Sequence, residues 1–167
     1  MGRRLRFRGE SRHKVDSKGR VSIPSSFRDV LRAGDPECTA EKALPNFVMV
    51  YGIPDAPYIE CFTIDEIESI EEQIEAMDYG DERDLLEEIY SSNASEANVD
   101  NTGRIVIPAK LREQFGIGSE AMMVASLNRF RIWDAEAYDA EKARRTAQMK
   151  TDVPRNPLQL LNKSREE

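Results

Sequence analysis

The residues with the clearest chemical potential belong to a segment that occurs twice. Residues 15–28 align without gaps on residues 99–112, and seven of the fourteen pairs are identical. Each segment carries the pattern Asp-x-x-Gly-Arg-x-x-Ile-Pro. The arginine after the glycine, Arg20 or Arg104, is able to pair with the aspartate of its own segment or to remain a solvated cation at the surface. The pattern alone leaves the role of this arginine open.

Each copy of the pattern predicts a tight turn that presents its arginine. Asp16 and Asp100 are placed to accept hydrogen bonds from backbone N–H groups two residues further on. Gly19 and Gly103 supply the positive φ that such a turn often needs. We therefore expect these four residues to form the turns.

A short strand and a helix are predicted after each turn. Residues 20–23 alternate polar and apolar side chains, which is the period of a half-buried strand. Residues 104–107 alternate less cleanly because Val106 is apolar, so we expect the second strand to be buried on both faces. A proline ends each strand and suits the first turn of a helix, predicted over 25–32 and over 109–115.

The two halves of the chain continue in parallel ways. Further strands are predicted over 47–51, 58–62, 121–126 and 129–133, and further helices over 65–77, 82–90 and 135–148. Each half then has about four short strands and one or two helices, which is below the size that buries a stable core alone. We expect the halves to pack together, or chains to pack with one another, in an α+β architecture.

Charge is distributed very unevenly along the chain. The formal net charge is −7, but the first twenty residues hold eight basic and two acidic residues, a net charge of +6. Residues 55–100 hold sixteen carboxylates against Arg83, a net charge of −15. This polarity favours a basic surface that binds nucleic acid. The alternative is a solvated acidic helix beside a disordered basic tail.

No pattern typical of an enzyme is present. His13 is the single histidine and is expected in an ordinary strand position. The sequence contains no GxSxG, P-loop or GxGxxG pattern. The acidic helix lacks His or Cys support for a metal, so we expect its carboxylates to be solvated: Glu66, Glu68, Glu71, Glu72 and Glu75. We expect no catalysis, no cofactor, no metal and no small-molecule substrate.

The chain is expected in the cytoplasm. It has no run of about 18 apolar residues and no apolar stretch behind its basic start, so neither a membrane span nor a secretory signal is predicted. Cys38 and Cys61 lack metal-binding spacing and are expected to be reduced thiols, with a disulfide as the alternative.

The doubled pattern resembles the MraZ family, and a single copy resembles the wider AbrB-like swapped-hairpin group. Phe7-Arg8-Gly9-Glu10 before the first copy and Arg131-Ile132-Trp133-Asp134 after the second also look like this family. The resemblance spans roughly 7–147. It implies an oligomeric ring of chains, each with two tandem swapped-hairpin β-barrel repeats and helices. The repeats are expected at 7–80 and 96–149, joined by a linker helix region at 81–95, with flexible extensions at 1–6 and 150–167.

The resemblance also implies a function. The family regulates transcription of the bacterial division and cell-wall gene cluster, binding promoter direct repeats in double-stranded DNA as a nucleoid-associated homo-oligomer. Its DNA-contacting arginine carries over to Arg20 and Arg104, with Lys18, Arg28 and Arg112 as weaker candidates. Thr102 replaces Lys18 in the second copy, so we expect unequal contributions. The alternatives are an AbrB-like antitoxin and a structural ring-forming protein.

Overall fold

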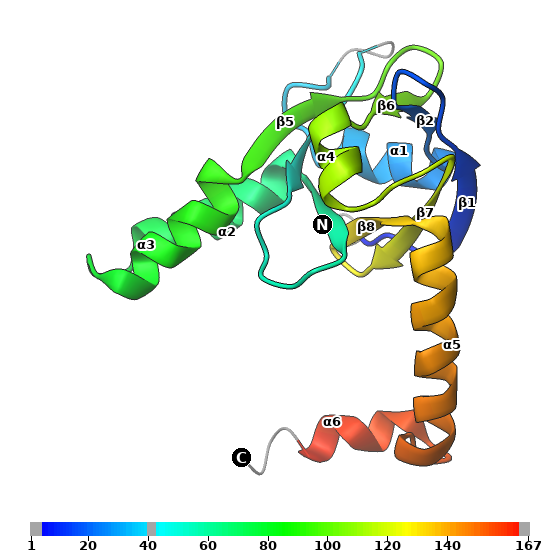
Figure 1. Ribbon diagram of the computed structural model, residues 1–167. Coiled ribbons are helices and arrows are strands. Elements are labelled where there is room, and N and C mark those ends of the chain that lie inside the picture. Colours follow the sequence, from blue (N-terminus) through cyan, green and yellow to red (C-terminus); the bar gives the residue numbers. More distant parts are fainter. Residues whose placement is uncertain (1–4, 40–42, 164–167) are drawn as a thin grey trace. The chain divides into compact units, whose positions relative to one another are not determined.

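The computed structural model describes residues 5–39 and 43–163, and the parts of the expected extensions at 1–4 and 164–167 lie outside these residues. The chain divides into two compact units, Met1–Ala135 and Glu136–Glu167, each described on its own. The strands of the first unit are β1 Glu10–Lys14, β2 Arg20–Ser22, β3 Asn46–Val50, β4 Tyr58–Thr63, β5 Ala94–Asn98, β6 Arg104–Val106, β7 Glu120–Ser126 and β8 Arg129–Asp134 (Figure 1). Its helices are α1 Ser25–Ala33, α2 Ile64–Glu75, α3 Asp81–Glu87 and α4 Ala109–Gln114, and α3 continues into a π turn at Glu88–Ser92.

The predicted α+β class is confirmed, and the predicted strands and helices are present with small shifts at their ends. Two strands that the sequence pattern did not locate, β1 and β5, precede the two motifs and are also 84 residues apart. His13 lies on β1, as expected.

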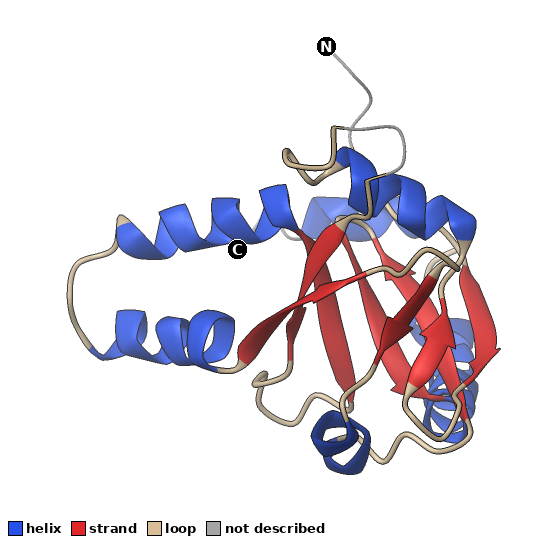
Figure 2. Ribbon diagram, turned by 90° about the horizontal axis from the view of Figure 1, so that it is seen from above, coloured by secondary structure: helices blue, strands red, loops and turns tan. Residues whose placement is uncertain are grey.

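The two halves of the chain exchange strands. Six antiparallel strands form one sheet, drawn in red with the other strands in Figure 2. Their order is β1-β7-β8-β4-β3-β5, so β1 pairs with a strand of the second half and β5 with a strand of the first half. A separate two-stranded ribbon pairs β2 with β6. The equivalent strands of the two halves are β1 and β5, β3 and β7, and β4 and β8. Exchanging the members of each pair gives the same strand order read from the other end, so the halves are related by a pseudo-two-fold axis.

The six-stranded sheet is open, with β1 and β5 as its edges. The resemblance implies closed β-barrels, whereas this sheet is not closed, because β1 and β5 lie at opposite ends of the strand order and do not pair with each other. The expectation that the two halves of one chain pack together is confirmed, because they share one sheet and one core.

The expectation for the second motif strand is wrong. Val106 was expected to be buried, but the residue is 50% exposed. The reason is that β6 pairs with β2 in a two-stranded ribbon whose inner face alone covers the core, where Val21 and Ile105 are buried.

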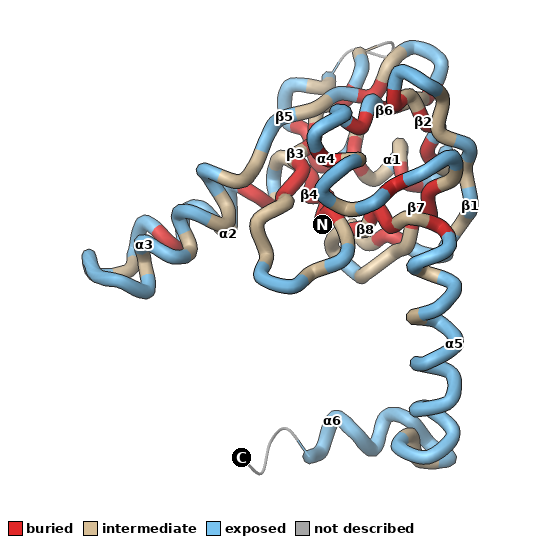
Figure 3. The backbone as a smooth tube through the Cα atoms, viewed as in Figure 1, coloured by how far each residue is buried: buried red, intermediate tan, exposed pale blue. Residues whose placement is uncertain are grey.

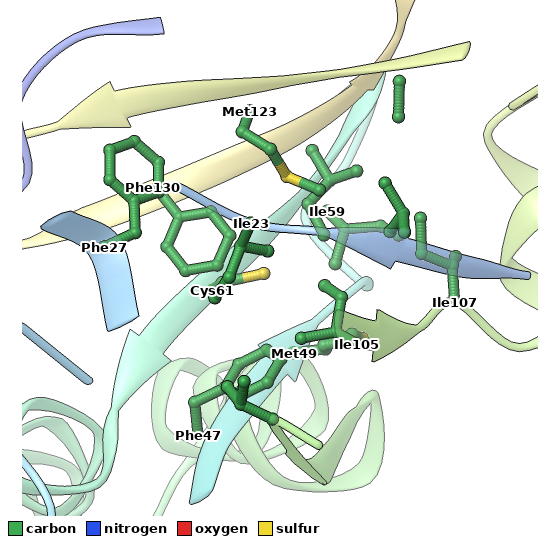
Figure 4. Packing of buried hydrophobic residues seen from close by; sticks show 14 of the residues in the cluster. Ile23, Phe27, Phe47, Met49, Ile59, Cys61, Ile105, Ile107, Met123 and Phe130 are labelled. Atoms are coloured by element: carbon green, nitrogen blue, oxygen red, sulfur yellow. The ribbon is translucent and has the colours of Figure 1, made fainter. Parts of the chain in front are cut away.

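One apolar core joins both halves of the first unit. Phe27 from α1 and Phe130 from β8 lie with ring centroids 5.2 Å apart, and Phe7 packs on both rings at 5.2 Å. Figure 4 shows residues of β3, β4 and β7 beside residues of the motif strands. The buried residues gather in the middle of this unit (Figure 3). The exchange of strands and the shared core make the halves one folding unit.

Helices α2 and α3 form an acidic helical hairpin, residues 64–92, that extends away from the sheet (Figures 1 and 2). Ile67 and Ile74 are buried, so the predicted apolar stripe of α2 faces inward. Four of the five glutamates expected in solvent are exposed: Glu68, Glu71, Glu72 and Glu75. Glu66 differs, because its carboxylate accepts a hydrogen bond of 2.7 Å from Nδ2 of Asn128. This contact ties the hairpin to the turn between β7 and β8.

The second unit is helical. Most of α5 (Ala135–Asp152) lies in it, followed by a 3-10 turn at Pro157–Gln159 and by α6, Leu160–Lys163. Arg144 and Arg145 donate to Glu141, and the hydrogen bond from Arg144 is the main cause that lowers the pKa of this carboxyl to about 2. None of the helices among the described residues has the length and apolar content that crossing a membrane requires.

Replacing a buried ring at the centre of the core should unfold the first unit most readily. Phe130→Ala removes a ring that contacts three other phenylalanines, so the free energy of unfolding should fall by about 3–5 kcal/mol. Urea denaturation followed by fluorescence measures the change. Tyr79→Ala is the matched control, because that ring is 88% exposed and its loss should change stability by less than about 0.5 kcal/mol. Equal losses in the two variants would contradict this description of the core.

Candidate nucleic-acid interface

The ribbon of β2 and β6 places the two motif arginines on one open face. Val21 pairs with Ile105, and both side chains are buried beneath the ribbon. Because successive side chains point to opposite faces of a strand, the neighbouring residues point outward. Arg20 lies opposite Val106, and Arg104 lies opposite Ser22. We call these four outward residues the arginine face. Its arginines are diagonal neighbours, with Cα atoms about 7–8 Å apart for such a pair.

The first motif turn is built around one carboxylate. Oδ1 of Asp16 accepts hydrogen bonds from the backbone N–H groups of Lys18, at 3.0 Å, and Arg20, at 2.8 Å. Its Oδ2 accepts a hydrogen bond of 2.6 Å from Nε of Arg20. Gly19 closes the turn at φ +84°, a conformation that favours glycine. The carboxylate therefore holds the backbone of the turn and Nε of Arg20 together.

The second turn repeats this geometry. Oδ1 of Asp100 accepts from the backbone N–H groups of Thr102, at 2.8 Å, and Arg104, at 2.9 Å, and Gly103 has φ +79°. Nε of Arg104 donates to Oδ2 of Asp100 at 3.3 Å and to the hydroxyl of Thr102 at 2.8 Å. Thr102 therefore helps to hold Arg104 through its hydroxyl. The equivalent residue of the first turn, Lys18, instead presents an exposed ammonium.

Both turn carboxyls are ionised at neutral pH. The backbone N–H of Arg20 lowers the pKa of Asp16, and the backbone N–H of Arg104 is the main cause that lowers the pKa of Asp100 to about 2. Each aspartate is therefore a permanent acceptor for its arginine. The arginine side chains remain 38% and 37% exposed.

The free ends of the two guanidinium groups are available to a ligand. Among the described residues, the side-chain hydrogen bonds of Arg20 and Arg104 involve Nε alone. Nη1 and Nη2 of each arginine are left to donate. A guanidinium held at Nε with two free donors is suited to a phosphate or to the O6 and N7 atoms of guanine.

The surroundings of the arginine face are basic on the side of the first turn. Lys14 and Lys18 are exposed on either side of Asp16. His13 adds no charge at neutral pH, because burial lowers its pKa, and its Nδ1 lies 3.2 Å from the hydroxyl of Ser22. The acidic helical hairpin, with twelve carboxylates against Arg83, extends away from the ribbon (Figure 1). A polyanion approaching this unit is therefore attracted to the arginine face and repelled from the hairpin.

The structure separates the predicted contact residues into two groups. Arg20, Arg104 and Lys18 lie at the surface of the ribbon and its turns. Arg28 on α1 and Arg112 on α4 are half-buried and lie against the glycines of the turns. Nε of Arg112 donates to the carbonyl oxygen of Ile107 at 3.0 Å. Sequence reasoning did not find the pairing of β2 with β6, because the pattern within one segment does not indicate which strand is its partner.

No group of acidic, histidine or cysteine side chains suited to a metal ion occurs within 5–39 and 43–163. Cys61 is buried in the core, and Cys38 is a separate free thiol after α1.

These features define a class of small α+β protein in which two copies of one turn motif exchange strands and present paired arginines. The sequence matches a family model described as "MraZ protein, putative antitoxin-like" over residues 6–87 and 91–156. A relative from Ruegeria sp. (strain TM1040), named "Transcriptional regulator MraZ", is 44% identical over 97% of both chains. Relatives of the same name from Cereibacter sphaeroides (strain ATCC 17029 / ATH 2.4.9) and Pseudomonas putida (strain ATCC 700007 / DSM 6899 / JCM 31910 / BCRC 17059 / LMG 24140 / F1) are 46% and 32% identical, each over 82% of this chain and 84% and 85% of their own. The chain belongs to the MraZ family.

The charge of Asp100 should contribute to stability only above acidic pH. Its pKa in the folded protein, about 2, lies below its ordinary value of 3.8, so the contribution is complete above that value and is lost as the pH falls toward 2. Asp100→Asn keeps an oxygen acceptor but removes the charge. Wild type should exceed this variant in free energy of unfolding at pH 7, and the difference should shrink toward zero at about pH 2. Urea denaturation of both proteins across this range measures it. A difference that does not change with pH would show that the charge is not its source.

Proposed function

We propose that this protein is a transcriptional regulator that binds double-stranded DNA through the arginine face. The observation that carries the proposal is the position of Arg20 and Arg104, side by side on an open ribbon with their terminal nitrogens free. The names of the relatives support the regulatory role. We further propose that the DNA includes direct repeats in the promoter of the division and cell-wall gene cluster, and that the protein is cytoplasmic and nucleoid-associated.

Binding follows from the chemistry of the face. The major groove of B-DNA admits a two-stranded β-ribbon, and a bidentate arginine is the commonest specific contact to guanine. Asp16 and Asp100 each hold Nε of one motif arginine, so the side chain loses little conformational freedom when its terminal nitrogens bind DNA. Lys18 adds a phosphate contact at the first turn, whereas Thr102 supports Arg104 instead. The two motifs therefore contribute unequally.

We also propose that several chains assemble into a homo-oligomeric ring. The edge strands β1 and β5 carry backbone groups that no strand of the same sheet pairs on their outer side, and such edges pair readily with further chains. Because β1 and β5 belong to different halves, contacts between unlike surfaces can close into a ring. The repeats would occupy 7–80 and 96–149. A ring binds direct repeats through several weak contacts at once.

An antitoxin is the second candidate, and the description of the family model favours it. An antitoxin of this kind usually carries one motif and a tail, whereas this chain carries two motifs that share one ribbon. A structural ring-forming protein is the third. Binding to the DNA upstream of its own gene, compared with random DNA of the same length at several salt concentrations, distinguishes the three. An antitoxin is indicated instead if deleting its gene is lethal only while a neighbouring gene is intact.

Removing either motif arginine should weaken DNA binding without changing the fold. Arg20→Ala and Arg104→Ala should each cost about 1–3 kcal/mol for a promoter duplex if the arginine reads guanine, and less for random DNA. If the arginine contacts phosphate, affinity for both duplexes should fall equally. The slope of log affinity against log salt concentration should then become shallower by about 0.9, the value for one phosphate contact. Fluorescence anisotropy measures both affinities. Arg155→Ala, an exposed arginine of the second unit, is the control and should bind as wild type does. Wild-type affinity in both Arg20→Ala and Arg104→Ala would exclude the arginine face.

The assembly proposal is tested independently of DNA. Light scattering across the micromolar range should give a particle several times the 19.0 kDa mass of one chain. The mass should be unchanged in Arg20→Ala, because that side chain lies on the arginine face and not on a sheet edge. A monomer at every concentration would contradict the ring.

A further inference from the structure

We propose that Arg28 and Arg112 are positioning residues, and that each supports the DNA-binding turn of the opposite repeat. Nothing in the doubled motif itself points to this, because each arginine follows the glycine of its own motif by nine residues. The DNA arm of the test rests on the proposed function, whereas its structural arm does not.

Arg112, on α4 of the second repeat, packs against the first turn. A Cβ atom placed on Gly19 would lie 2.9 Å from Nε and 3.2 Å from Cζ of Arg112, so the guanidinium lies directly on this glycine. The same Nε donates to the carbonyl oxygen of Ile107, which fixes the guanidinium in place. The backbone N–H of Ile107 in turn donates to the carbonyl oxygen of Gly19 at 2.8 Å. The first turn is therefore held by two residues of the second repeat.

Arg28, on α1 of the first repeat, stands in the same relation to the second turn. A Cβ atom on Gly103 would overlap the Arg28 guanidinium. The backbone N–H of Ile23 donates to the carbonyl oxygen of Gly103 at 3.1 Å. Both turns thus share the packing of an arginine on the glycine and a backbone hydrogen bond from the opposite repeat, and the two observations involve different residues.

The turns need this support because they are short. Each has five residues, one of them at positive φ, and most of its own hydrogen bonds involve one aspartate. A guanidinium packed on the glycine limits the movement of the peptide that precedes Arg20 or Arg104. The close approach leaves no room for a side chain at the glycine. Arg28 and Arg112 are also half-buried.

A reciprocal dependence of the two repeats follows. Loss of Arg112 should disorder the turn that carries Arg20 and leave the turn of Arg104 intact, although Arg104 is closer to Arg112 in sequence. Loss of Arg28 should do the reverse. One repeat alone then lacks a complete DNA-binding turn, so the duplication is a requirement for either turn and not a second copy of a self-sufficient site.

The structural arm compares hydrogen exchange of the two turns by mass spectrometry in the full-length protein without DNA. In Arg112→Ala, exchange over 16–21 should rise several-fold while exchange over 100–105 stays at the wild-type rate, and Arg28→Ala should reverse the pattern. Lys110→Ala removes an exposed cation from the same helix and should change neither turn. Arg112→Lys keeps the aliphatic stem and the charge but not the planar guanidinium, so it provides the test if Arg112→Ala does not fold. Faster exchange in 100–105 for Arg112→Ala would overturn the proposal.

The DNA arm is a double-mutant comparison on the upstream duplex. Arg112→Ala should lower affinity about tenfold in wild type and in the Arg104→Ala background, but have little further effect in the Arg20→Ala background. Arg112→Lys should not restore binding, whereas a lysine would restore most of a phosphate contact. Equal losses in both backgrounds, with rescue by lysine, would show that Arg112 contacts DNA directly. If wild type does not bind DNA at all, the proposed function fails, and the exchange pattern still decides the positioning role.

Discussion

Burial of Val21 against Ile105 is the constraint on which the arginine face depends. The strands that carry these residues have three residues each and pair only with one another, and an isolated two-stranded ribbon is marginally stable in water. The ribbon persists because its inner face covers the common core. Once those two side chains point inward, the alternation of a strand forces the motif arginines outward. The same apolar contact that joins the halves therefore also creates the arginine face.

The exchange of strands gives this contact its strength. The strand before each motif is paired with the hairpin of the other half: β1 extends the hairpin of the second half, and β5 extends that of the first. The halves therefore cannot separate, and β2 cannot leave β6, without breaking the six-stranded sheet. The glycines add a second link, because each turn lies against an arginine from the other half. Packing, backbone pairing and turn support thus all include contacts between the halves. The position of each turn therefore depends on the other half of the chain.

Charge separation explains how an acidic chain can present a basic surface. The acidic helical hairpin carries its carboxylates on a projecting element, and its apolar residues pack on a smaller cluster around Phe62 and Val50. The arginine face lies on another part of the unit, where Asp16 and Asp100 are the nearby carboxylates of the turns. These two carboxylates are largely engaged by backbone N–H groups, and so they orient the arginines without blocking their outer nitrogens. The net charge of −7 therefore says little about the local field at the ribbon.

The sequence by itself determined the local backbone structure of each motif. The positive φ of Gly19 and Gly103 and the strand and helix after each turn follow from interactions within a few residues, and most predicted elements lie where expected. The exposure of Val106, the open sheet and the position of Arg28 and Arg112 against the opposite turns were decided by tertiary structure. They depend on which strand pairs with which across 84 residues, and periodicity within one segment carries no information about its partner. Two similar halves make self-pairing and exchange equally compatible with the sequence pattern. Only the packing of both halves on one core selects exchange.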